Sequence, residues 1–152
     1  MAGIDYVTVT SDVLDLAALT DMVGREDAGA ISTFIGTTRN SFKGREVVRL
    51  EYEAYGTMAE KQMKIICATL REKFSVINIA IAHRIGVVPV RETSVIIAVS
   101  SAHRIDSLQA VHYGIDAVKE LVPIWKKEFY ADGSVPEWKE NCEGCTRTLN
   151  AH

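Results

Sequence analysis

The stretch that decides the fold reads K-E-L-V-P-I-W-K-K-E-F-Y, from Lys119 to Tyr130. Pro123 has no N–H to donate, and its ring collides with the carbonyl group four residues earlier, that of Lys119. A helix that carries Lys119 must therefore end before Pro123, and Val122 is driven into extended geometry. Because a strand is expected to follow, Lys119 and Lys126 belong to different elements that meet at one corner. Lysines in such an apolar and aromatic setting indicate a pocket that binds an anion or activates an amine.

The composition is that of an ordinary globular chain. Of its 152 residues, 47% are hydrophobic and 24% charged, and one domain is the simplest interpretation. No apolar run approaches the roughly 20 residues that cross a bilayer, and the N-terminus lacks the features of a secretory signal, so we expect a soluble protein of the cytosol. The net charge of −3 argues against nucleic-acid and membrane-surface partners. Any anion must be met by a local cluster of cations.

The three cysteines are odd in number and do not predict a disulfide framework. Cys67 lies in an apolar helical pattern and is predicted to be a buried core thiol. Cys142 and Cys145 form a single C-E-G-C near the C-terminus, without the second pair of ligands that a structural zinc site needs. We interpret them as incidental residues of a tail and predict no metal and no cofactor. Zinc binding is the lowest-ranked alternative.

Hydrophobic periodicity predicts strands that alternate with helices. Strands are expected at residues 5–10, 29–36, 46–54, 76–83, 94–100 and 126–131. The segment 37–46 reads as an exposed loop, and Pro89 limits residues 86–93 to a turn or a short edge strand. Within the strand at 46–54, alternation predicts a shared face for Val48, Leu50, Tyr52 and Ala54.

Helices are expected between these strands, each with a polar residue at its start. The predicted caps are Ser11 or Asp12 for the first helix, Thr57 with Glu60 in a capping box for the second, and Asp106 or Ser107 for the third. The predicted buried stripes contain, in helix order, Leu14, Leu16, Leu19, Met22 and Val23; Met58, Met63, Ile66 and Leu70; and Leu108, Val111, Ile115 and Val118.

The resulting order is β-α-β-β-α-β-β-α-β, with hairpin-like connections between paired strands. This order predicts an α+β fold in which helices pack on a mostly antiparallel sheet. No linker divides the chain. We predict a single domain at residues 1–140, followed by a polar tail at residues 141–152.

Four polar segments stand at the ends of the predicted elements. They are G-T-T-R-N at 36–40, S-S-A-H-R at 100–104, Lys119, and K-K-E at 126–128. Each has an ordinary explanation when taken alone, since Arg39 could be solvated, His103 could pack, and Lys119 is favoured near a helix C-terminus. Taken together, they predict cations that converge at one edge of the sheet.

Such cations are suited to a small anion. Arg39 and Arg104 could each hold a phosphate or carboxylate through two parallel hydrogen bonds, and the start of the third helix would add backbone N–H groups. Crowding by the arginines would favour the neutral amine of a neighbouring lysine, and His103 could titrate near neutral pH. The residues therefore predict a cationic pocket without a metal cluster or a phosphate-binding glycine loop.

Five motifs resemble those of one enzyme family. They are F-I-G-T-T-R-N at 34–40, L-E-Y-E-A-Y at 50–55, H-R-I-G-V-V-P-V at 83–90, S-S-A-H-R at 100–104 and V-P-I-W-K-K-E at 122–128. In order and spacing over residues 5–140, the chain resembles the large, catalytic subunit of molybdopterin synthase. The predicted domain at 1–140 would then be the catalytic domain of such a subunit.

The resemblance implies a sulfurtransferase of molybdenum cofactor biosynthesis, which converts cyclic pyranopterin monophosphate to molybdopterin by installing two sulfurs as a dithiolene. The sulfur would come from a thiocarboxylate at the C-terminal Gly-Gly of a small ubiquitin-like partner subunit. Two copies of the large subunit would form the homodimer core of a heterotetramer. Because this chain ends in Leu-Asn-Ala-His, we expect it to be the catalytic partner and not the sulfur carrier.

By position, the resemblance also implies the site residues. Lys119 and Lys126 would be catalytic, the first as the main proton-transfer group and the second as a stabiliser of developing negative charge, whereas Trp125 would only pack. Substrate binding would involve Thr37, Thr38, Arg39, His103, Arg104, Lys119, Lys126, Lys127 and Glu128. The rival interpretation is a non-catalytic module whose cations bind an acidic C-terminal peptide tail.

Overall fold

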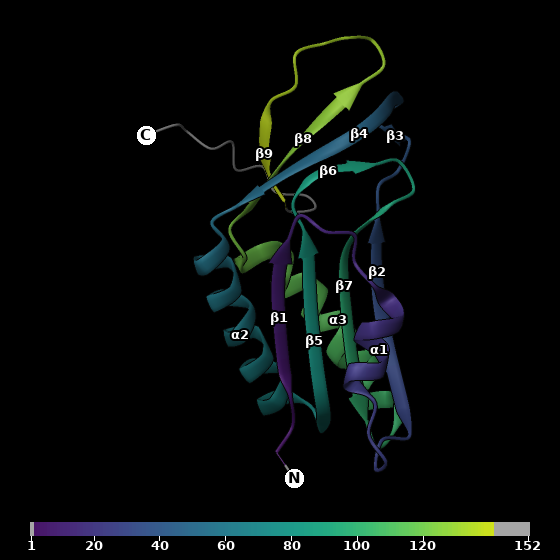
Figure 1. The fold of residues 1–152 in the computed structure, drawn as a ribbon, viewed down its shortest axis with the longest axis vertical. Helices are drawn as coiled ribbons and strands as arrows, with labels where there is room; N and C mark the ends of the chain where they lie inside the picture. Colours follow the sequence, from purple (N-terminus) through teal and green to yellow (C-terminus); the bar gives the residue numbers. More distant parts are fainter. Residues whose placement is uncertain (1, 142–152) are drawn as a thin grey trace.

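The structure is a computed structural model and describes residues 2–141. Its strands form two sheets, the second of which lies across one end of the first (Figure 1). The first sheet has the order β1 (Asp5–Thr10), β5 (Val76–Arg84), β7 (Thr93–Ser101), β2 (Ala30–Thr37). The second contains β3 (Ser41–Phe42), β4 (Arg45–Ala54), β8 (Ile124–Tyr130) and β9 (Trp138–Glu140), with β6 (Gly86–Pro89) paired to β4.

The strand pairing confirms an α+β fold with mostly antiparallel sheets. Within residues 2–141, β1 and β5 are the only strands that pair in parallel. The expected hairpin between β2 and β4 is wrong, because β2 pairs with β7 whereas β4 pairs with β6 and β8 in the other sheet. The connecting loop instead forms β3 and a tight turn, in which Lys43 and Gly44 have φ values of 49° and 77°.

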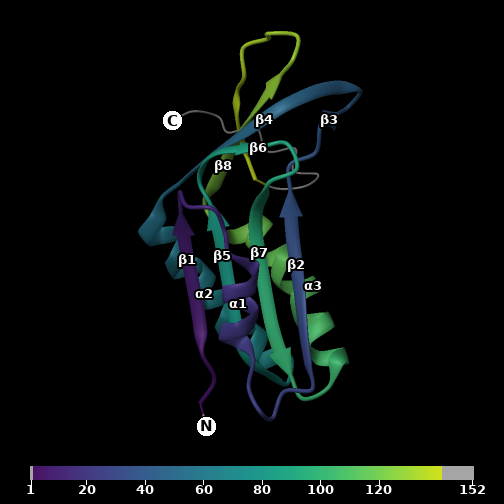
Figure 2. The same cartoon turned by 45° about the vertical axis from the view of Figure 1, so that its right-hand side comes forward.

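The helices cover both faces of the first sheet. α2 (Gly56–Lys73) and α3 (Arg104–Leu121) lie on one face, and Figure 2 shows α1 (Leu16–Val23) on the other face, in front of β5 and β7. Alternation along β5 divides the core accordingly. Ile79 and Ile81 join the large cluster under α2 and α3, whereas Ala80 and Ala82 join a small cluster under α1. The small alanines let the short helix α1 approach the sheet closely.

The predicted end of α3 is confirmed. The helix ends at Leu121, and Val122 has extended geometry with φ −84° and ψ 127°. β8 then begins at Ile124, directly after Pro123. The restriction that proline imposes on the preceding residue thus turns the chain from α3 into the second sheet. Lys119 remains in the last helical turn and Lys126 lies in the strand.

The predicted starts of the helices are wrong. Asp15 caps α1, since its Oδ1 accepts the N–H of Ala18 at 3.1 Å. α2 begins at Gly56, and Glu60 does not complete a capping box because its Oε1 accepts the N–H of Val9 at 3.1 Å. His103 takes the cap position of α3, ahead of the expected Asp106 or Ser107.

Several residues lie on faces other than predicted. Met58 and Leu108 are 59% and 55% exposed, and Leu16 is also exposed. In α3 the buried position next to Leu108 is held by Ser107, so a polar residue occupies the stripe where an apolar one was expected. In β4 a register shift between Val47 and Arg49 turns Val47 inward and leaves Val48 exposed. Of the remaining stripe residues, Leu14, Met22 and Ile115 are half-buried, and the buried ones are Leu19, Val23, Met63, Ile66, Leu70, Val111 and Val118.

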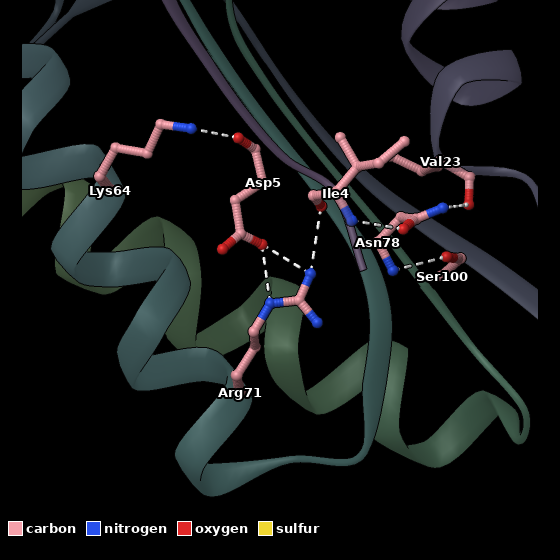
Figure 3. A network of polar contacts seen from close by, with 7 residues as sticks. All are labelled: Ile4, Asp5, Val23, Lys64, Arg71, Asn78 and Ser100. Carbon is pink, nitrogen blue, oxygen red and sulfur yellow. Dashed lines mark hydrogen bonds and ion pairs between the residues drawn. The ribbon is translucent and has the colours of Figure 1, made fainter. Parts of the chain in front are cut away.

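A polar network fixes the end of the first sheet that lies far from the second sheet (Figure 3). Asn78 is 2% exposed, and its side chain accepts the N–H of Ile4 at 2.7 Å and donates to the carbonyl oxygen of Val23 at 3.2 Å. The backbone N–H of Asn78 donates to Oγ of Ser100 at 3.1 Å. Asn78 on β5 therefore ties the segment that leads into β1 to α1 and β7, with both polar atoms of its side chain satisfied.

Candidate functional site

A group of polar side chains lies where the second sheet crosses the end of β5; we call it the junction cluster. Its members, each of which interacts with another member, are Tyr52, His83, Ser94, Lys119, Lys126, Glu128, Lys139 and Asn141. Lys126 on β8 stands between Tyr52 on β4 and Lys139 on β9, its partners in the two strand pairs. Because directly paired residues of antiparallel strands share a face, these three side chains lie on the same side of the sheet.

Glu128 supplies negative charge to the junction cluster. Its side chain is 5% exposed, with Oε1 3.9 Å from Nζ of Lys126 and Oε2 3.5 Å from Nζ of Lys139. The hydroxyl of Tyr130 donates to Oε2. A buried carboxylate is stable only with such partners, so Glu128 holds the two ammonium groups in place. Loss of water contact, followed by the Glu128 carboxylate, raises the pKa of Tyr130 to about 12.

His83 is the neutral member of the junction cluster. It is 1% exposed, its Nδ1 lies 2.8 Å from the carbonyl oxygen of Arg84, and its Nε2 lies 3.3 Å from Nδ2 of Asn141. Because a carbonyl oxygen only accepts, Nδ1 carries the proton and Nε2 accepts from the amide of Asn141. Burial lowers the pKa of His83 to about 4; the Arg84 carbonyl opposes this shift and the charge of Lys119 adds to it. At neutral pH the imidazole is uncharged.

Both predicted catalytic lysines border this histidine. Lys119 is half-buried in the last turn of α3, close enough for its charge to act on His83. Lys126, with a side chain 20% exposed, pairs with Tyr52, whose ring contacts that of His83. The two lysines therefore come from different elements, as the sequence predicted, with Lys119 near His83 and Lys126 paired with Tyr52. Trp125 packs edge to face against Tyr55, with ring centres 5.3 Å apart.

Lys127 lies apart from the other predicted site residues of β8. It pairs with Glu51 and Trp138, on the face opposite to that of Lys126 and Glu128. Its Nζ sits 4.3 Å from the centre of the Trp138 ring, a cation–π contact. The structure therefore does not bring Lys127 together with Lys126.

The predicted loop after β2 lies at the end of the first sheet that the second sheet crosses. Thr38 is 3% exposed, and its N–H donates to the carbonyl oxygen of Glu92. Its own carbonyl oxygen accepts the N–H of Arg91 at 2.8 Å, and its hydroxyl donates to the carbonyl oxygen of Val88 at 3.4 Å. Thr38 is thus a structural anchor of this loop. Its neighbours Thr37 and Arg39 are exposed.

His103 and Arg104 lie at the opposite end of the same sheet. β2 and β7 are antiparallel, with Ala30 opposite Ser101 and Thr37 opposite Thr93. The two strand exits are therefore separated by the length of a strand, roughly 23 Å at 3.3 Å per residue. The prediction that Arg39, His103 and Arg104 converge within one chain is wrong, because adjacent antiparallel strands leave a sheet at opposite ends.

Several members of the junction cluster had no predicted role. His83 stands at the end of the otherwise apolar run I-A-I-A-H, a position that could have marked it as a buried polar residue. Asn141 is 7% exposed although it was expected to begin the polar tail, and it gave no local signal. Tyr52 was expected only to pack.

Other chemistry predicted or excluded from the sequence can be placed as well. Cys67 is confirmed as a buried thiol, and burial raises its pKa to about 12, so it does not act as a nucleophile. Cys142 and Cys145 lie outside the described residues. Within residues 2–141, no group of three or more His, Cys, Asp or Glu side chains could hold a metal ion. No helix in that range is long and apolar enough to span a membrane.

Comparison with known proteins places the chain in a family. The family model described as MoaE protein matches residues 9–121. The molybdopterin synthase catalytic subunit of Dictyostelium discoideum is 50% identical over 149 residues, which cover 97% of this chain and 94% of the relative. A crystal structure of molybdopterin synthase from Staphylococcus aureus matches with a TM-score of 0.82 and 38% identity, covering 87% of this chain and 95% of that one.

A more distant structure shares the fold. It is a complex of subunits 1 and 2 of the molybdopterin-converting factor from Helicobacter pylori, with a TM-score of 0.67 and 19% identity over 84% of this chain and 86% of that one. The resemblance noted in the motifs is confirmed by the family match and by relatives at 50% identity or more. This chain therefore belongs to the MoaE family, whose members include the catalytic subunits of molybdopterin synthase.

Proposed function

We propose that this chain is the catalytic subunit of a molybdopterin synthase, a sulfurtransferase that converts cyclic pyranopterin monophosphate to molybdopterin, in the cytosol. The observation that carries the proposal is the junction cluster, in which Lys126 lies beside the buried Glu128 and Lys119 lies near a neutral His83. It occurs in a chain that is 50% identical to a subunit of that name. The cluster offers both proton transfer and positive charge in a partly dehydrated setting.

The chemistry explains why lysines suffice. A thiocarboxylate sulfur is already a good nucleophile, so the protein does not need an activated cysteine or serine. Its tasks are to hold two anions together, to assist the loss of oxygen leaving groups and to release the spent acyl group. Lys119 is the main proton-transfer group and Lys126 stabilises developing negative charge. The carboxylate of Glu128 keeps Lys126 oriented.

The sulfur donor is a small ubiquitin-like subunit with a C-terminal thiocarboxylate. Two features support such a partner: the motif resemblance, and the description of the Helicobacter pylori relative as a complex of two subunits. The carboxyl-terminal tail of the donor is anionic, as is the cyclic phosphate of the pterin. Both suit a site that carries lysines on two elements.

The anion-binding residues require a second copy of the chain. Arg39 lies at one end of β2, whereas His103 and Arg104 lie beyond the other end of the β2–β7 pair. A two-fold axis beside the middle of β2 would exchange these ends, and place Arg39 of one copy near His103 and Arg104 of the other.

The exposed edge of the sheet favours this arrangement. β2 is the outer strand of the first sheet in the described structure, and its Ile31 and Ile35 are 45% and 39% exposed. An axis at Phe34 would set Arg39 opposite Gly29 of the second copy. Gly29 donates its N–H to the carbonyl oxygen of Ser101 at 2.9 Å, directly before the His103 turn. The homodimer thus completes two identical sites.

The function is tested by turnover. The purified chain is incubated with the thiocarboxylated small subunit and cyclic pyranopterin monophosphate, and both the small molecule and the proteins are analysed by mass spectrometry. We expect a product that has gained two sulfurs and a small subunit returned as its carboxylate. Binding of the small subunit without any sulfur in the pterin would instead identify a non-catalytic module for an acidic tail.

A further inference from the structure

The turn between β7 and α3 presents His103 and Arg104, and three buried serine hydroxyls stabilise it through hydrogen bonds. Ser101 ends β7, Ser107 lies in the second turn of α3, and Ser32 lies in β2. Ser101 and Ser107 are fully buried and Ser32 is 9% exposed. Buried hydroxyls are kept only where they are hydrogen-bonded, so their partners indicate what they hold.

These hydroxyls form one connected chain of hydrogen bonds. Oγ of Ser101 donates to the carbonyl oxygen of His103 at 2.6 Å and accepts the N–H of Ser107 at 3.1 Å. Oγ of Ser107 donates to the carbonyl oxygen of Arg104 at 3.2 Å. Since that proton is then used, the 2.7 Å contact between Ser32 and Ser107 has Ser32 as donor. The chain therefore ends on the backbones of the two residues proposed to bind the substrate.

Ser101 also binds the start of α3, where the side chain of His103 does not cap the helix. His103 occupies the cap position of α3, yet its side chain makes no capping hydrogen bond within the described structure. The N–H of Ser107, in the early part of the helix, is satisfied by Ser101 instead. The imidazole of His103 and the guanidinium of Arg104, both exposed, are thereby left to face a ligand.

Gly29, directly before β2, adds a further restraint on this turn. A Cβ atom on Gly29 would lie 2.3 Å from the carbonyl oxygen of Ala102, so only glycine allows this close approach. Gly29 thus restrains the start of the turn, and Ser32 in β2 restrains it beneath α3 through Ser107. Such rigid support is what an anion site needs, since small displacements of binding groups weaken binding strongly.

We propose that Ser101 and Ser107 are positioning residues that set the orientation of His103 and Arg104 toward the phosphate of the pterin substrate. The inference rests on the proposed function. Neither serine touches the substrate; each acts through a backbone carbonyl of the turn. Because the serines act only on groups that bind the substrate, disturbing the turn weakens substrate binding more than it slows the chemical step.

The test is steady-state kinetics of the Ser101→Ala variant, assembled with the thiocarboxylated small subunit. We expect KM for cyclic pyranopterin monophosphate to rise about tenfold while kcat stays within about threefold. Ser101→Thr keeps the hydroxyl, and threonine is favoured in strands such as β7, so this variant should have the KM of the wild-type protein. Ser107→Ala tests the Arg104 branch independently, and it carries the proposal if Ser101→Ala does not fold.

Ser100→Ala is the matched control. Ser100 is adjacent in sequence and fully buried, and its hydroxyl accepts the N–H of Asn78 in the network of Figure 3, away from the turn. This variant loses one buried hydrogen bond, so its Tm should fall comparably, but KM should not change. If Ser101→Ala and Ser107→Ala both have the same KM as Ser100→Ala, the inference is overturned.

Arg104→Ala in the same assay separates this inference from the proposed function. If Arg104→Ala raises KM and neither Ser101→Ala nor Ser107→Ala does, the serines are merely structural and the proposed site stands. If Arg104→Ala leaves KM unchanged while the wild-type protein turns over, Arg104 does not bind the substrate and the positioning role falls with it.

Discussion

The ring of His83 meets that of Tyr52 edge to face, with ring centres 5.0 Å apart and 69° between the ring planes. His83 belongs to the first sheet and Tyr52 to the second, so the contact joins the two sheets beside Lys126. On its other side His83 accepts from Asn141, which follows the strand that carries Lys139. His83 therefore supports the strands on both sides of Lys126.

The burial of neutral His83 predicts a loss of stability in mild acid. A pKa of about 4 in the folded state, against 6.5 when unfolded, means that the unfolded chain binds more protons between these values. The contribution of neutral His83 to the free energy of unfolding is complete above pH 6.5 and is lost as the pH falls toward 4. It should remove about 2 kcal/mol of unfolding free energy between pH 7.5 and pH 5.0, measured by urea denaturation.

The His83→Gln variant is the control for this prediction. Its amide can still donate and accept but does not titrate, so other groups alone set its pH dependence. Its stability should fall less than that of the wild-type protein over the same pH range. Parallel curves for the two proteins would contradict a buried neutral histidine.

Lys126 and Lys127 form a natural matched pair, because the two are adjacent but lie on opposite faces of β8. Lys126→Ala removes a cation from the junction cluster and should lower kcat by about 10²–10³. Lys127→Ala removes only the contact over Trp138 and should lower kcat by less than about threefold. The kcat values of the two variants are compared in turnover measurements with saturating small subunit. Equal losses would mean that the face toward Glu128 is not the active one.

A site shared between two copies predicts complementation. Arg39→Ala and His103→Ala homodimers should each have low activity, because every site lacks one group. When the two variants are unfolded together and refolded, heterodimers contain one site with both mutations and one intact site. Random assortment should restore about one quarter of the wild-type activity.

The control for complementation is a mixture of the Arg39→Ala and Lys119→Ala variants. If Arg39 and Lys119 belong to the same chain in each site, this mixture should regain no intact site. Activity in this control but none in the Arg39 and His103 mixture would show that the proposed division between copies is wrong.

Local rules predicted the elements that hold the lysines. Pro123 has a fixed steric effect on its neighbours, so the end of α3 and the extended Val122 could be derived without knowing the rest of the fold. Hydrophobic periodicity similarly predicted strands at 76–83 and 94–100, and these strands pair as an antiparallel unit.

The partners of the strands could not be derived in this way. A period of two residues shows that a strand has two faces, but it does not show which strand lies beside it or in which direction. Arg39 and His103 were therefore expected together, although β2 and β7 carry them to opposite ends of the sheet. Val47 turns inward because of a register shift between β4 and β8, and Asn141 is buried because it binds His83, which is distant in sequence. Neither feature leaves a signal in the local sequence.

The central claim is that Lys119 performs the chemistry, and the most direct measurement is dithiolene formation by the Lys119→Ala variant. The assay uses thiocarboxylated small subunit and cyclic pyranopterin monophosphate, with small-subunit affinity and Tm measured in parallel. Lys61→Ala, which removes an exposed lysine from α2, serves as the control and should remain fully active. We predict a rate reduced by about 10²–10⁴ for Lys119→Ala, with partner binding and fold intact. A near-normal rate under those conditions would contradict the account.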